Sequence, residues 1–227
     1  MKKLTKCAIL LAISSTAFAA SATEQTEEVN YGDPTASFST VGTSVSENTT
    51  QLNGMMGLGS NIFSLDLGVA NKDNGGNEKG DLSYRGRYFH VTDGLGYSVD
   101  VLGDKNSTTA LAGAIYKFQV TDNISVFPML SAGYTKTDTP KGENKNESGL
   151  GQVGIYAMYG FDAGHWVYVN PKSTYHIESK EFINQVEAGG GIMVLDNVSV
   201  GAKLEYTAKS DYIPEDTVGW IQANVYF

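Results

Sequence analysis

The sequence predicts an all-β fold: a transmembrane, antiparallel, up-and-down β-barrel of twelve strands, with ten strands as the alternative. Three observations lead to this fold class. Segments of about ten residues, the length that a tilted strand needs to cross a bilayer, recur between polar turns. Within these segments apolar and polar side chains alternate. The final segment, residues 217–227, alternates in the same way and ends on an aromatic residue, Phe227.

The N-terminal segment, residues 1–22, has the pattern of a cleaved secretory signal. Three lysines precede an apolar stretch around residues 8–13, and small residues follow. The apolar stretch is too short to span a membrane as a helix, and its flanks suit export. Small residues at the right spacing allow cleavage after Ala19 or after Ala22.

Export would leave a chain without cysteine, because the single cysteine, Cys7, lies inside the signal segment. The exported chain is therefore expected to have no disulfide, thiolate metal site or cysteine nucleophile. Loss of the three signal lysines takes the formal net charge from −9 to −12. So acidic a chain is a poor match for nucleic acid, whose binding relies on basic contacts to phosphate. Residues 23–34 are expected to form a disordered periplasmic tail, and residues 35–227 to form the barrel.

Short and long connections alternate along the predicted barrel. Five tight turns are built from residues that tolerate positive φ or bond their own backbone. They are Ser60-Asn61, Asp93-Gly94, Asp122-Asn123, Asp162-Ala163-Gly164 and Asp196-Asn197. Six longer or more charged loops are predicted near 46–50, 72–80, 103–107, 138–149, 178–181 and 209–216. The ten-strand alternative arises because segments 36–45 and 165–177 are the least regular.

The two faces of the predicted strands differ in composition. One face of segment 62–70 carries Phe63, Leu65, Leu67 and Val69, and the other carries Ser64, Asp66 and Gly68. Segments 95–104 and 198–209 divide in the same way, whereas 110–120, 124–134 and 165–177 divide less cleanly. On the apolar face, aliphatic residues hold the middle of the strands and aromatic residues gather near both ends. This composition indicates a lipid-facing band between two aromatic girdles.

Together, the signal segment, the alternating segments, the terminal strand and the turn asymmetry resemble a small porin-type outer-membrane β-barrel of Gram-negative bacteria. The resemblance covers essentially the whole chain after residue 22, and it concerns the class rather than one family. It implies an outer-membrane location with both termini in the periplasm. In length and strand number the chain is similar to the twelve-stranded porins for acidic oligosaccharides. Those porins have a strongly basic lumen, whereas this chain has only two arginines, Arg85 and Arg87, which argues against an acidic sugar.

The last strand carries a prediction about assembly. Ile221, Val225 and Phe227 lie on its apolar face. In a closed barrel the last strand pairs with the first, so that no edge remains. We expect outer-membrane lipid to surround this face and the barrel-assembly machinery to recognise these three residues.

Eight charged residues are predicted to face the lumen at mid-depth. They form two groups: Asp66, Arg85, Arg87 and Asp100, and Lys172, Glu187, Lys203 and Glu205. The turn at Asp93-Gly94 places Arg87 opposite Asp100 or one diagonal step from it, and a fold near 179–180 places Lys172 opposite Glu187. These charges are interpreted as ion pairs that lower the cost of charge in a narrow interior, or as a constriction that selects solutes by charge. Because acids and bases nearly balance, no strong ion preference is indicated.

These features predict a narrow passive channel for small hydrophilic solutes, because twelve strands enclose more space than a filled eight-stranded barrel. Glycines on the lumen face, Gly57 among them, would leave room. The alternative is a largely closed barrel with a structural or surface-recognition role, such as adhesion. An enzyme is not predicted, because the three histidines accompany no nucleophile elbow and no zinc-binding helix motif. No cofactor and no metal are expected.

Overall fold

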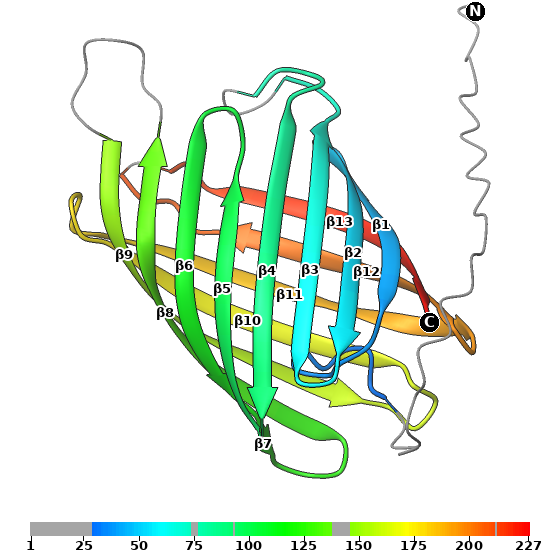
Figure 1. Cartoon of the computed structure of the whole chain (residues 1–227). Coiled ribbons are helices and arrows are strands. Elements are labelled where there is room, and N and C mark those ends of the chain that lie inside the picture. The colour runs from blue at the N-terminus through cyan, green and yellow to red at the C-terminus, as the bar shows by residue number, and fades with distance from the viewer. Residues whose placement is uncertain (1–28, 74–76, 93, 138–145, 212) are drawn as a thin grey trace, which may run out of the picture.

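A ring of antiparallel strands forms the fold, with β1 lying beside β13 (Figure 1). The computed structural model describes residues 29–73, 77–92, 94–137, 146–211 and 213–227. The predicted signal segment and residues 23–28 of the predicted tail lie outside the described residues. The strands are β1 (Thr40–Ser46), β2 (Thr49–Leu58), β3 (Asn61–Ala70), β4 (Leu82–Thr92), β5 (Leu95–Gly103), β6 (Ser107–Tyr116), β7 (Phe118–Gln119), β8 (Ile124–Thr137), β9 (Asn146–Gly160), β10 (Trp166–His176), β11 (Glu181–Leu195), β12 (Val198–Thr207) and β13 (Asp216–Tyr226). In this part of the chain no helix is long and apolar enough to cross a membrane.

The predicted twelve-stranded antiparallel barrel is confirmed. Neighbouring strands in sequence pair around the ring, β6 pairs with β8, and β1 pairs with β13 to close it. The short β7 pairs with β8 and keeps the register of β6. The same register places Tyr116 opposite Pro128, which has no N–H to donate to a ladder. The break between β6 and β7 therefore follows from a proline inside β8.

The outward face is apolar along nearly every strand. Leu65, Val99 and Leu204 are exposed there, and Ser64, Asp100 and Lys203 lie on the inward face of the same strands. A soluble sheet would bury such a continuous apolar face, and its exposure around the whole ring is the pattern of a barrel that lies in lipid.

The tight turns lie close to the five predicted positions, the first being shifted by one residue to Gly59 and Ser60 because β3 already begins at Asn61. The loops at the opposite end differ in part from the prediction. β1 and β2 are joined by only two residues, so the loop near 46–50 is a turn. β9 begins at Asn146, inside the loop predicted for 138–149, and residues 138–145 lie outside the described residues. β8, β9 and β11 reach 14, 15 and 15 residues, longer than a bilayer crossing requires.

Large apolar side chains line the inside of the barrel at the tight-turn end. We call this set the inner apolar layer, and it comprises Ile62, Phe89, Ile115, Phe127, Met158, Trp166 and Tyr226. Each points inward near the tight-turn end of its strand. The layer explains why segments 110–120, 124–134 and 165–177 divide less cleanly, because Ile115, Phe127 and Trp166 are apolar residues on the inward face.

Residues 30–39, here called the strap, lie against the inner apolar layer before β1 begins. Tyr31 stacks on Tyr226 with ring centroids 3.7 Å apart, and its edge meets Phe38 at 5.1 Å. Residues 30–34 of the predicted tail are thus packed inside the barrel mouth in this structure.

Candidate functional site

The first charged group of the lumen is centred on Asp100 of β5. Arg87 on β4 lies directly opposite Asp100 in the register, and its Nε donates a hydrogen bond to Asp100 Oδ1. Nε of Arg85 lies 3.5 Å from the same oxygen. Asp100 is only 6% exposed, so the two guanidinium groups compensate a buried carboxylate. The predicted pairing of Arg87 with Asp100 agrees with this register.

Asp66 is held from the other side, by two strands that sequence reasoning did not connect with it. Asn53 on β2 donates an Nδ2–H to Asp66 Oδ1 at 2.8 Å, and the hydroxyl of Ser44 on β1 donates to Asn53 Oδ1 at 2.7 Å. Asp66 also faces Arg85 across the β3–β4 pair. A polar chain therefore runs along the inner wall from β1 to β5.

The second charged group joins β10, β11 and β12. Nζ of Lys203 lies 2.6 Å from Glu205 Oε1 and 3.5 Å from Glu187 Oε2. The hydroxyl of Tyr168 donates to Glu187 Oε1 at 2.7 Å. The ammonium group of Lys203 also lies 5.4 Å from the centre of the Trp220 ring, within the range of a cation–π interaction.

Lys172 does not lie opposite Glu187, so this predicted pairing is wrong. The register pairs Lys172 with Gln185 and Glu187 with Asn170. The cause is the connection between β10 and β11, which consists of residues 177–180. The hairpin is therefore centred between residues 178 and 179, one residue earlier than the predicted fold near 179–180. Each cross-strand partner therefore shifts by two positions, and Lys172 stays one diagonal step from Glu187.

The two charged groups face each other across the lumen. The charge of Lys172 on β10 interacts with Asp100 and with Arg85, which lie on the far side of the ring. The eight predicted residues thus form one set, called the lumen belt from here on. Four carboxylates and four cations give the belt a formal charge of zero.

A small cavity separates the lumen belt from the strap. Its volume is about 260 Å³, and it is lined by the carboxylate of Glu187, the amides of Gln222 and Asn224, and the rings of Tyr31, Tyr168 and Trp166. The strap therefore forms the floor of the lumen. Sequence reasoning missed this floor, although the inward apolar residues near the tight turns were a signal for it.

Catalytic and metal-binding arrangements have little support. Nδ1 of His165 accepts the backbone N–H of Met193 at 3.0 Å, and Nδ1 of His90 lies 3.1 Å from Asn61 Oδ1. Both rings thus have structural partners near tight turns. Among the described residues, no group of three or more His, Cys, Asp or Glu side chains is placed to hold a metal ion.

Comparison with known proteins identifies the fold. No protein-family model matches the chain, and no curated protein matches its sequence. The COG4313 outer membrane channel from Pseudomonas putida F1 matches with a TM-score of 0.61 and 11% identity, over 88% of this chain and 100% of that one. The NanC porin matches with a TM-score of 0.59 and 9% identity, over 83% of this chain and 98% of that one. The KdgM porin matches with a TM-score of 0.55 and 9% identity over the same shares.

These likenesses define a class of protein by its fold. The chain has the fold of the small outer-membrane porins, and the match spans almost the full length of each of the three structures. At identities of 9–11% the likeness concerns the fold alone.

Proposed function

We propose that the protein is a bacterial outer-membrane channel that passes small hydrophilic solutes passively. The lumen belt is the observation that carries this proposal. It places eight charged side chains inside the barrel, where a merely structural barrel would be filled more cheaply by apolar residues. Twelve strands leave an interior between that of a filled eight-stranded barrel and that of a wide porin, so we expect the passage to be narrow.

Planar-bilayer recording tests this proposal directly. Purified protein that runs as the folded form on unheated gels should produce discrete current steps. In a salt gradient the reversal potential should stay near zero, because the belt has no net charge to favour one ion. Folded protein that gives no steps, even with the strap removed, would contradict the channel and favour the closed barrel.

A largely closed barrel with a surface role is the second candidate, and the inner apolar layer with the strap favours it. At the loop end, Nζ of Lys105 lies 2.6 Å from Asp81 Oδ2 and 3.8 Å from Glu78 Oε1. The hydrogen bond from Lys105 lowers the pKa of Asp81. Such ordered, charged loops could serve surface recognition or adhesion.

The proposal includes an orientation and an assembly signal. Both chain ends and the tight turns would lie on the periplasmic side, as in other bacterial barrels. Ile221, Val225 and Phe227 point outward from β13, where lipid and the assembly machinery can reach them.

Truncation of the Phe227 side chain should separate assembly from stability. Phe227 is 77% exposed, so Phe227→Ala removes few contacts and should leave the unfolding midpoint of refolded protein nearly unchanged. In cells, the same change should lower the fraction of chain that reaches the membrane as heat-modifiable barrel. Tyr226→Ala provides the contrast, because Tyr226 is buried against the strap and should lower the midpoint. Equal membrane levels of parent and Phe227→Ala protein would contradict a signal at this position.

A further inference from the structure

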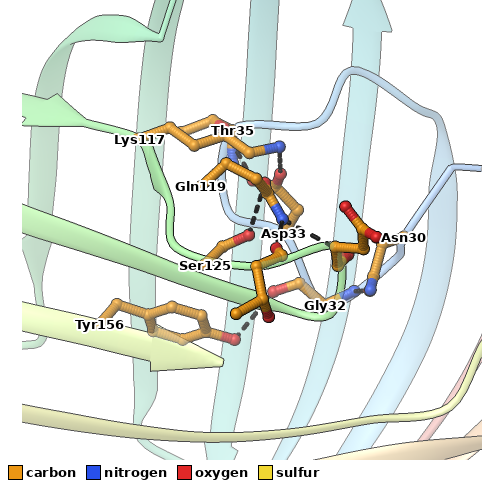
Figure 2. A network of polar contacts seen from close by, with 10 residues as sticks. Asn30, Gly32, Asp33, Thr35, Lys117, Gln119, Ser125 and Tyr156 are labelled. Carbon is orange, nitrogen blue, oxygen red and sulfur yellow. Dashed lines mark hydrogen bonds and ion pairs between the residues drawn. The ribbon is translucent and has the colours of Figure 1, made fainter. Parts of the chain in front are cut away.

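The strap crosses the tight-turn mouth of the lumen and is tied to opposite parts of the ring. Asp33 is 7% exposed, and its Oδ2 lies 2.6 Å from Nζ of Lys117, which follows β6. On the same side of the ring, the hydroxyl of Tyr156 on β9 donates to the carbonyl of Gly32 at 2.9 Å. Figure 2 shows these two contacts reaching the strap from separate strands. On the opposite side, the ring of Tyr31 stacks on Tyr226 of β13.

The strap has a defined shape of its own. Oδ1 of Asp33 accepts from the backbone N–H of Thr35 at 2.7 Å and from its hydroxyl at 2.6 Å. The N–H of Gly32 donates to Asn30 Oδ1 at 2.9 Å. Gly32 lies so close to Trp166 that an added Cβ would stand 2.4 Å from the indole ring. These local bonds form a compact turn that fits against the inner apolar layer.

The strap is nevertheless not part of the sheet. Ladder pairing starts at Thr40. Among the described residues, the hydrogen bonds between backbone groups of the strap are local, apart from the carbonyl of Ser39, which accepts from Phe227 N–H at 3.1 Å. Movement of the strap would therefore break one ion pair, the bond from Tyr156 and ring contacts, and would leave the strand ladders intact.

Open space lies on both sides of the strap. A cavity of about 620 Å³ separates Asp33 and Thr35 from the β7–β8 connection, where Gln119 and Asn123 line it. Another, of about 520 Å³, lies between Tyr31 and the turns that carry Gly164 and Asp196. The strap thus spans the mouth as a bar, with room to be displaced.

We propose that the strap is a gate at the periplasmic mouth, held shut by the Asp33–Lys117 ion pair and opened by withdrawal about residues 39–40. This inference rests on the proposed channel function. In the closed state the strap and the stacked ring of Tyr31 block the way from the lumen belt to the mouth. In the open state the strap leaves, and the belt becomes the narrowest part of the passage.

A reversible disulfide can lock the strap in place. An ideal Cβ on Gly160 would stand 3.4 Å from Cγ of Asn30, close to the separation of one Cβ and the opposite sulfur in a disulfide. The double change Asn30→Cys with Gly160→Cys, made with Cys7→Ser, should therefore cross-link on mild oxidation. We expect the oxidised protein to lose its current in planar bilayers and dithiothreitol to restore it. Each single-cysteine variant is the control and should conduct alike under both conditions.

Loosening the ion pair should have the opposite effect. Lys117→Met keeps the length of the side chain and removes its charge. We expect the ratio of closed to open time to fall about tenfold, the equivalent of about 1.4 kcal/mol. The matched control is Lys136→Met, which removes one lysine at the exposed loop end of β8, away from the strap, and should not alter gating.

The outcomes separate the gate from the channel. A disulfide that forms without reducing the current would overturn the gate and leave the channel standing. Failure of the two cysteines to cross-link in folded protein would show that the strap does not occupy the mouth, and would also overturn the gate. Absence of current from reduced, folded protein, from Lys117→Met and from protein with the strap removed would instead overturn the proposed channel itself.

Discussion

An arginine introduced at Val153 should destabilise the folded barrel in lipid by about 2–4 kcal/mol, the cost of a cation near the bilayer midplane. Val153 lies at the centre of β9, faces outward and is 54% exposed. A guanidinium group there would face lipid beside Leu130 on β8, and the hydroxyl of Ser173 opposite it on β10 already donates to Asn184 Oδ1. Reversible urea unfolding in lipid vesicles would measure the loss.

The neighbouring residue provides the matched control for Val153→Arg. Gln152 has the same depth in the same strand and points into the lumen, where its Nε2 donates to Thr174 Oγ1 at 2.8 Å. Gln152→Arg should cost much less, since its charge would meet water and other polar groups. Equal losses at the two positions would contradict a lipid-facing exterior and favour a soluble sheet.

The strand faces and the closure of the ring were predictable because they depend on local signals. Side chains alternate with a period of two along any strand, so the inward position of Asp66, Arg85 and Lys203 followed from the sequence pattern. Turn residues fixed the order of the strands, and the apolar exterior distinguished a barrel in lipid from a sandwich with a single buried face.

Register was predictable only where a connection was short. The short connection between Thr92 and Leu95 limited the partner of Arg87 to Asp100 or a diagonal neighbour, and the register pairs the two directly. The longer connection before β11 allowed an error of one residue at its centre. Because pairing runs in opposite directions on the two strands, that error displaced the partner of Lys172 by two positions. Charge interactions across the lumen, such as that of Lys172 with Asp100, depend on the closed ring and have no local signal.

The strap was missed for a different reason. Polar and acidic composition before Asp33 suggested a tail without structure, whereas tertiary contacts with Trp166, Tyr156 and Tyr226 place part of it inside the barrel. Gly57 shows the same limit. It was interpreted as lumen space, but an added Cβ there would stand 2.6 Å from the backbone nitrogen of Phe38. The glycine therefore allows the strap to approach β2.

Removal of both lumen arginines should alter ion selectivity and stability together. Arg85→Ala with Arg87→Ala changes the formal charge of the lumen belt from zero to −2 and leaves Asp100 without its guanidinium partners. Charges interact more strongly in a confined passage than in bulk water, so the reversal potential in a salt gradient should move to the cation-selective side. The free energy of unfolding should fall by about 3 kcal/mol, because the buried carboxylate of Asp100 loses its partners. This value is the lower end of the range for an unpaired buried charge, since the side chain of Arg85 is 41% exposed and water already weakens its pairing.

Addition of Asp100→Asn to this double variant distinguishes the two effects. The amide removes the uncompensated charge, so most of the lost stability should return, and the belt charge becomes −1. Selectivity for cations should then weaken without reverting to that of the parent. If stability stays low in the triple variant, the arginines act by packing, as the 4.9 Å approach of the Arg87 guanidinium to the Phe89 ring would allow. If the reversal potential does not move in either variant, the lumen belt does not line the path of the ions, and the narrowest point must lie at the strap.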